Sequence, residues 1–178
     1  MRTLVWTVVA VALTTSVPVL AEDVTYDYAK GTDFAAYKTY SWTEGTKAAN
    51  PLMDQRITGA INTQLTAKGL IPADADATPN LCVAYHAAVD TQLSMDTWNT
   101  GGWGGWRWGG GFGSAHTSIN KILVGQIIVD IVDAAKKEIV WRGVVSGTID
   151  PKASPEKLDK TVNNGMEKLF KNYPPKAK

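Results

Sequence analysis

Few side chains in this sequence are of the types that carry metal or redox chemistry. The chain has one cysteine, Cys82, and two histidines, His86 and His116. Cys82 and His86 fall on one face of a predicted strand, but four residues at about 3.3 Å each separate them by roughly 13 Å. Zinc ligands lie within about 2.3 Å of one ion, so we predict no metal site. His86 is better explained as a packed strand residue hydrogen-bonded to a neighbour, and Cys82 as a small buried hydrophobic residue.

The carboxylates and serines also lack the spacing of a catalytic site. Asp130 and Asp133 differ by three positions along a predicted strand and its end, so we expect them on opposite faces, not as a general acid/base pair. Asp133 is typical of a residue that starts a turn, and Trp141-Arg142 indicates a core tryptophan followed by a solvent or edge charge. No G-x-S-x-G turn occurs. We therefore predict no enzymatic activity and no cofactor.

A glycine- and tryptophan-rich segment at 98–114 is the candidate binding site. Between residues 98 and 113 lie eight of the 16 glycines and four of the seven tryptophans. Glycine lets the backbone turn freely, whereas each indole covers on the order of 200 Å² when buried. The segment matches neither the Walker pattern nor G-x-G-x-x-G. The candidate binding residues are Trp98, Trp103, Trp106, Arg107, Trp108 and Phe112.

Three interpretations of this segment stay open. It packs back on the protein's own sheet, or it forms a recognition surface, or it mediates self-association or remains disordered. As a recognition surface it would stack aromatic faces on sugar rings, peptide or lipid headgroups. Arg107 would add a cation–π or anion contact.

The first 21 residues have the three-part pattern of a cleavable signal peptide. Arg2 provides a positive start, residues 4–13 form an apolar run, and Pro18 lies in the stretch that breaks it. Cleavage is predicted near Ala21. Glu22 stands where a lipoprotein would carry its acylated cysteine, so we expect no lipid anchor and no transmembrane span after cleavage. The predicted location is the periplasm or cell envelope.

The charge of the exported part excludes one class of partner. Without the leader, the chain carries equal numbers of acidic and basic residues, 17 of each. An electrostatic footprint for nucleic acid is therefore absent.

Hydrophobic periodicity predicts one α+β domain over 22–178. A helix is expected to begin at Asn50-Pro51 and to end at Gly69, and a second helix begins at Ser154-Pro155. The order is β-β-α-β-β-β-α, which favours two layers: a mainly antiparallel sheet of about five strands with both helices on one face. The predicted strands cover residues 24–28, 37–42, 81–89, 125–132 and 139–149.

Several motifs of the chain resemble the domain of unknown function 4136 family. They are Asp33-Phe34, 37–42, 67–70, 81–86, 125–133 and 139–143. The resemblance covers about residues 24–175 and implies the fold and location of bacterial envelope proteins, often lipoproteins, with no assigned activity. This chain departs from the pattern in lacking the acylated cysteine and in carrying Asn80 where relatives often have aspartate.

The sequence therefore favours a non-catalytic binding or assembly module of the envelope. The segment at 98–114 would contact a glycan, a peptide or a protein partner. The alternative is a structural or self-associating envelope protein with that segment packed on its own core, and a hydrolase ranks third.

Overall fold

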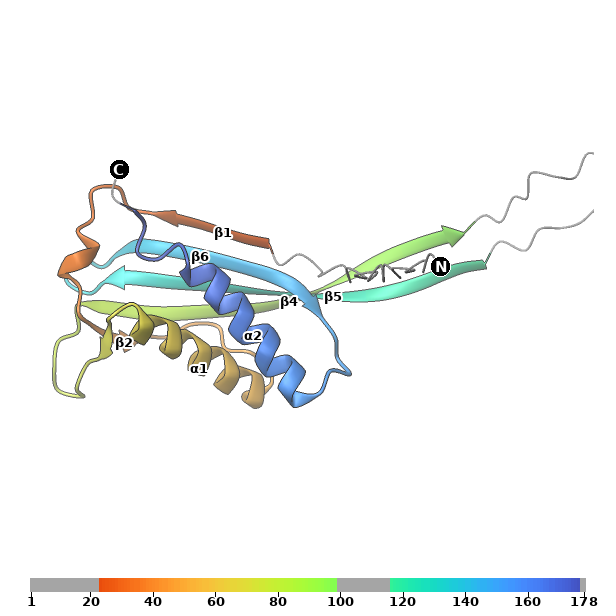
Figure 1. The fold of residues 1–178 in the computed structure, drawn as a ribbon, viewed down its shortest axis with the longest axis horizontal. Coiled ribbons are helices and arrows are strands. Elements are labelled where there is room, and N and C mark those ends of the chain that lie inside the picture. Colours follow the sequence, from red (N-terminus) through yellow and green to blue (C-terminus); the bar gives the residue numbers. More distant parts are fainter. Residues whose placement is uncertain (1–22, 99–115, 177–178) are drawn as a thin grey trace, which may run out of the picture.

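The computed structural model describes residues 23–98 and 116–176, with the backbone alone at 90–98 and 116–122. It confirms an α+β fold, in which two helices cover one face of a six-stranded sheet (Figure 1). The sixth strand, beyond the predicted five, is the two-residue β3. The elements are β1 (Asp23–Tyr28), the 3-10 helix η1 (Phe34–Ala36), β2 (Thr39–Trp42), α1 (Pro51–Ala67), β3 (Ile71–Pro72), β4 (Leu81–Trp98), β5 (His116–Asp133), β6 (Glu138–Ile149) and α2 (Pro155–Phe170).

The sheet has the order β1-β6-β5-β4-β2-β3. The neighbouring strands β1, β6, β5 and β4 pair antiparallel. By contrast, β2 pairs parallel with β4 and with β3. The parallel β2–β4 pair requires a crossover, and α1 provides it. The sheet is thus mixed, with the antiparallel pairs in the majority.

The first helix begins and ends where its sequence predicts. The Asn50 side chain accepts hydrogen bonds from the backbone N–H groups of Leu52 and Met53, and Pro51 occupies the first turn. Gly69 follows the helix with a φ of +83°, a conformation that favours glycine. The residues that α1 buries against the sheet are Ile57, Ala60, Ile61 and Leu65.

The core is closed by an indole that lies over a glycine on the same strand. Trp141 of β6 is fully buried against Phe170 and Tyr173, with ring centroids 5.5 and 5.4 Å away. Gly143, two residues further along β6, leaves the room that the indole occupies. A Cβ at Gly143 would lie 2.7 Å from Leu169 Cδ1 and would also collide with the Trp141 ring.

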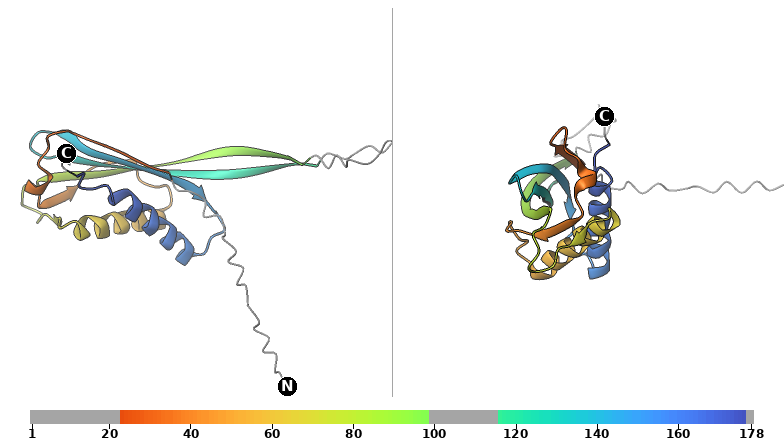
Figure 2. Two further views of the ribbon diagram at one scale, coloured as in Figure 1. Left: turned by 45° about the horizontal axis from the view of Figure 1, so that its top comes forward. Right: turned by 90° about the vertical axis from the view of Figure 1, so that its left-hand side faces the viewer.

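The hairpin of β4 and β5 is much longer than the rest of the sheet (Figures 1 and 2). Each strand has 18 residues, and the register runs without a shift from Leu81↔Asp133 to Trp98↔His116. The third strand, β6, accompanies β5 only as far as the pair Leu123↔Ile149. The last seven pairs of the hairpin therefore form a two-stranded ribbon, residues 92–98 and 116–122, which we call the arm.

The arm corrects the predicted strand ends. The sequence pattern ended one strand at residue 89 and began the next at 125, and both predictions were wrong by nine residues. At about 3.3 Å per residue, the arm extends roughly 23 Å beyond the last pair that β6 supports. The fold thus places the chain on both sides of the tryptophan-rich segment far from the helices.

Candidate functional site

The tryptophan-rich segment is attached to the tip of the arm. Trp98 ends β4 and pairs in register with His116, the first residue of β5. Trp103, Trp106, Arg107, Trp108 and Phe112 lie outside the described residues, as does the predicted signal peptide. Of the predicted binding residues, the structure therefore locates only the backbone of Trp98.

A group of charged side chains lies on the sheet face opposite the helices. Arg142 of β6 donates two hydrogen bonds to Asp130 of β5, from Nε to Oδ1 at 2.6 Å and from Nη2 to Oδ2 at 2.7 Å. The Asp130 side chain is 7% exposed and that of Arg142 is 48% exposed. Hydrogen bonding to Asp130, with the attraction of its charge, raises the pKa of Arg142. Arg142 is exposed, as predicted for a solvent or edge charge, and the β5–β6 register also places it directly opposite Asp130.

His86 borders this ion pair from β4. Its Nδ1 accepts a hydrogen bond from the backbone N–H of Thr46 at 3.2 Å, as expected for a strand histidine bonded to a neighbour. An accepting Nδ1 places the proton of the neutral ring on Nε2, which lies 3.7 Å from Asp130 Oδ2. Asp130 is thus hydrogen-bonded to Arg142 and lies next to the ring of His86. The hydroxyl of Thr46 lies 3.1 Å from His86 Nδ1 on the other side of the ring. These contacts link the segment at Thr46 with β4, β5 and β6, as a structural tie between strands would.

Asp133 lies on the other face and starts the β5–β6 turn, as predicted. Its Oδ1 accepts hydrogen bonds from the backbone N–H groups of Ala135 and Lys136, each at 2.9 Å. The hydroxyl of Tyr37 donates to its Oδ2 at 2.8 Å. These hydrogen bonds lower the pKa of Asp133, those from the Lys136 backbone and from Tyr37 contributing most. Asp130 and Asp133 are therefore separate structural carboxylates, not an acid/base pair.

Two tyrosines that donate to carboxylates are expected to ionise late in an alkaline titration. Burial, followed by the hydrogen bond to a carboxylate, raises the pKa of Tyr37, bonded to Asp133, and of Tyr85, bonded to Asp54, to about 12. Because the folded-state pKa lies above the ordinary tyrosine value of 10.0, the stability that each phenol contributes is complete below pH 10. It is lost as the pH rises through about 12.

The measurement is near-ultraviolet absorbance of tyrosinate against pH, with circular dichroism to follow unfolding. Tyr37→Phe is expected to remove one late-ionising phenol and to keep the fold at neutral pH. Tyr85→Phe is the matched variant for the second phenol. An unchanged number of late phenols in Tyr37→Phe would contradict the assignment.

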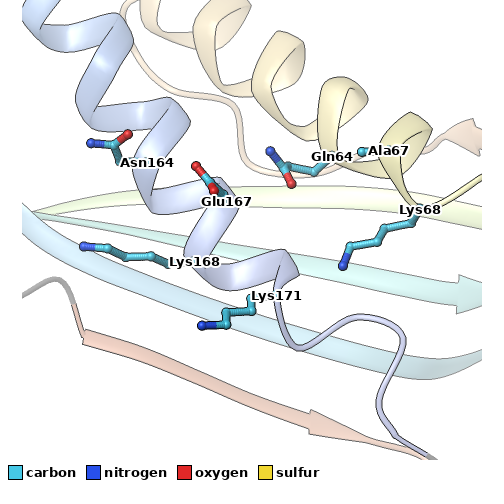
Figure 3. Close-up of a pocket in the computed structure, with 7 residues that line it drawn as sticks. All are labelled: Gln64, Ala67, Lys68, Asn164, Glu167, Lys168 and Lys171. Atoms are coloured by element: carbon cyan, nitrogen blue, oxygen red, sulfur yellow. The ribbon is translucent and has the colours of Figure 1, made fainter.

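An open groove of about 610 Å³ runs between the C-terminal halves of α1 and α2 (Figure 3). Its lining residues are Gln64, Ala67, Lys68, Asn164, Glu167, Lys168 and Lys171. Three lysines and one glutamate give this groove a positive charge, and lysines near helix C-termini are the usual complement of the helix dipole. The lining holds no serine, threonine, cysteine or histidine.

The described residues contain no cluster of three metal-binding side chains. Over 23–98 and 116–176, neither helix has the length and apolar character needed to cross a membrane.

Residues 24–175 match the DUF4136 family, described as a domain of unknown function. The chain belongs to this family. The match confirms the resemblance seen in the sequence motifs and covers all the helices and strands except the first residue of β1. No curated protein matches the sequence.

Solved structures with the DUF4136 fold come from several bacteria. A DUF4136 family protein from Bacteroides thetaiotaomicron is 14% identical with a TM-score of 0.53, covering 86% of this chain and 96% of its own. A PDZ domain protein from Parabacteroides distasonis is 15% identical with a TM-score of 0.56, covering 87% of this chain. This chain spans only 36% of that protein's length. PelC from Paraburkholderia phytofirmans, a dodecamer, is 12% identical with a TM-score of 0.51, covering 84% and 95%.

These likenesses establish the fold of a DUF4136 domain. The features that sequence reasoning missed are the arm and the Asp130–Arg142 pair. Asp130 and Arg142 occupy adjacent predicted strands of a hairpin, and that was the one signal for their pairing. The sequence did not predict the length of the β5–β6 turn, which fixes the register of these two strands.

Proposed function

We propose that this protein is a non-catalytic binding or assembly module of the bacterial envelope. Its tryptophan-rich segment, presented at the tip of the arm, contacts a glycan, a peptide or a protein partner. The observation that carries the proposal is the attachment of this segment to a ribbon that extends beyond the third strand of the sheet.

The arm favours contact with another molecule over packing on the protein's own core. The segment joins the chain at Trp98 and His116, roughly 23 Å beyond the supported part of the sheet. The core of the described body is closed without it, because Trp141, Phe170 and Tyr173 are already buried. Four indoles in one short segment provide large flat surfaces of the kind that dominate binding energies at interfaces.

The envelope location is supported by the signal-peptide pattern of residues 1–21 and by the family resemblance. The proposal of a non-catalytic role is supported by the contacts of Asp130 and Asp133 in the described part of the chain. Asp130 is paired with Arg142, and Asp133 is engaged by a turn and by Tyr37. The ion pair and the hydrogen bonds give both carboxylates a structural role.

Tryptophan fluorescence tests the binding proposal. Envelope glycans, peptides and liposomes are added in turn to the purified protein, and one class is expected to produce a saturable blue shift. Trp103→Ala/Trp106→Ala/Trp108→Ala is expected to weaken that binding at least about tenfold, equivalent to 1.4 kcal/mol. Trp42→Phe is the control, because Trp42 is a partly exposed indole of the body, 37% exposed, away from the arm. No shift with any class, or unchanged binding by the triple variant, would contradict the proposal.

Self-association is the second candidate function. The dodecameric state named for the PelC structure supports it, since a protein of this fold assembles from many copies. The open edges of the arm support it independently.

A further inference from the structure

We propose that the outer edge of β1 binds an extended segment of a partner protein, which adds to the sheet as a further antiparallel strand. The segment carries apolar residues at alternate positions and lysine or arginine between them. β1 is the end strand of the sheet, and no other described strand or helix lies beyond it (Figure 1). This site is separate from the tryptophan-rich segment, so the inference goes beyond the proposed function.

The pairing of β1 with β6 determines which backbone groups of β1 face outward. The N–H of Ala29, the residue after the strand, donates a hydrogen bond to the Val140 carbonyl at 2.9 Å. Bonded pairs alternate along an antiparallel ladder. The register therefore places the next bonds to β6 at every second residue back to Asp23. The N–H and C=O groups of Val24 and Tyr26 point the other way, and an open row of such groups is a template for another strand.

One end of this edge is closed and the rest is open. The carboxylate of Asp27 accepts a hydrogen bond from the backbone N–H of Tyr28 at 2.8 Å and so occupies that donor. Within the described residues, no hydrogen bond from another element reaches the N–H groups of Val24 and Tyr26. Proline, lysine and bulges commonly protect sheet edges, and β1 contains none of them. The open part of the edge thus lies around Val24 and Tyr26.

On the helix side of the sheet, the edge carries an exposed aromatic ring. Tyr26 is 45% exposed, and its register partner on β6 is Gly143, which has no side chain to cover it. The ring stacks on that of Tyr28, with centroids 6.4 Å apart and planes inclined by 14°. Added strands bind through main-chain hydrogen bonds and gain specificity from alternate side chains. An apolar residue opposite Tyr26 would cover this ring, which favours apolar side chains at every second position of the partner.

On the other face of the sheet, the edge is acidic. Asp23 and Asp27 are exposed and lie on the side of the sheet that carries Arg142. Arg142, the register partner of Asp27, is engaged by Asp130. In the described part of the chain, no lysine or arginine forms an ion pair with Asp23 or Asp27. Opposite charges on adjacent strands are stabilising and like charges are destabilising, so the edge selects a partner with basic residues on this face.

A capped heptapeptide in which valine and lysine alternate is the probe for this edge. We expect it to bind saturably and to slow hydrogen exchange at the Val24 and Tyr26 amides, measured by NMR. The Thr25 amide, which faces β6, is the internal reference and is expected to keep its rate. A peptide with glutamate in place of lysine is expected to bind about tenfold more weakly. No binding, equal binding of both peptides, or unchanged exchange at Val24 and Tyr26 would overturn the inference.

Two substitutions at Val24 test the backbone contact. Val24→Pro removes one outward N–H and keeps the bonds to β6, since proline is tolerated on edge strands. It is expected to weaken peptide binding about fivefold, the effect of one lost hydrogen bond. Val24→Thr keeps the N–H and is the matched control, with binding expected to stay unchanged. Equal binding by the two folded variants would overturn the inference.

The double variant Asp23→Asn/Asp27→Asn tests the charge and does not depend on proline at the edge. Asparagine keeps the shape of both side chains and an oxygen that accepts the hydrogen bond from the Tyr28 N–H. The variant is expected to bind the lysine and glutamate peptides equally. A preference for lysine that survives in this variant would overturn the assignment of a basic partner.

Two further readouts identify other occupants of the site. Exchange at Val24 and Tyr26 that slows with rising protein concentration, without peptide, would assign the edge to a second copy and overturn the inference. Trp103→Ala/Trp106→Ala/Trp108→Ala leaves β1 intact and is expected to bind the heptapeptide with unchanged affinity. Loss of binding in that variant would place the peptide at the tryptophan-rich segment and would overturn the edge site. The two proposals therefore fail separately.

Discussion

Gly143→Ala is expected to lower the free energy of unfolding by about 3 kcal/mol, the upper part of the range for overpacking a core. The added methyl group would lie 2.7 Å from Leu169 Cδ1 and would collide with the ring of Trp141. Both neighbours are fully buried, so neither moves into solvent to relieve the clash. For a domain of this size the loss corresponds to a fall in Tm of roughly 10 °C, measured by thermal denaturation.

Gly59→Ala is the matched control for this prediction. Gly59 lies in the exposed part of α1, and a Cβ there has no atom within 4 Å. Alanine in a helix interior is favoured over glycine by up to about 1 kcal/mol, so this variant is expected to be more stable than the parent protein. Equal effects of the two substitutions would contradict the packing argument for Gly143.

Arg142→Met is expected to cost about 3 kcal/mol of stability, because it leaves the carboxylate of Asp130 buried without its partner. The Asp130 side chain is 7% exposed, and the two Arg142 hydrogen bonds are its shortest contacts. We place the loss at the lower end of the range for a broken buried pair, because Arg142 itself is half-exposed and water approaches from its side. Urea denaturation at neutral pH measures the effect.

The double variant Asp130→Asn/Arg142→Met separates charge burial from lost packing. Removing the charge with its partner is expected to restore most of the stability, since the isolated carboxylate is the source of the penalty. Arg56→Met provides the surface control. Its partner Asp159 is 53% exposed, and a surface ion pair contributes less than about 1 kcal/mol. A double variant as unstable as Arg142→Met would contradict the account.

Local sequence signals predicted the elements whose ends depend on their own residues. Asn50 and Pro51 start α1 through hydrogen bonds and backbone geometry that neighbouring residues supply. Gly69 closes it because the chain needs a positive φ at that position. Trp141 was predicted as core from its place in an apolar strand, and it is fully buried.

The arm could not be predicted in the same way. Residues 90–98 are mostly polar and small, and only the pairing with 116–124 makes them a strand. That pairing continues the β4–β5 register of the body of the sheet, which runs without a shift from Leu81↔Asp133, and is not visible in the local pattern. The same dependence hid the Asp130–Arg142 pair, since a shift of one residue would put the two side chains on opposite faces.

The sequence predicted which residues form the candidate site but not where the fold places the ends of that segment. The tryptophans and glycines are visible in the sequence, whereas the distance of their attachment points from the core depends on the arm. For this reason the sequence left packing on the core and recognition as open alternatives, and the fold of the hairpin favours recognition.

The pairing of β1 with β6 joins two segments that lie far apart in the sequence. The first strand of the sheet, Asp23–Tyr28, has its hydrogen-bonding partners at residues 141–146. Contacts between such distant segments form slowly, because the long intervening loop must close first. A chain that crosses a membrane from its N-terminus would therefore keep its leading strand unpaired until nearly all of it had passed. Such a chain would complete its fold only on arrival.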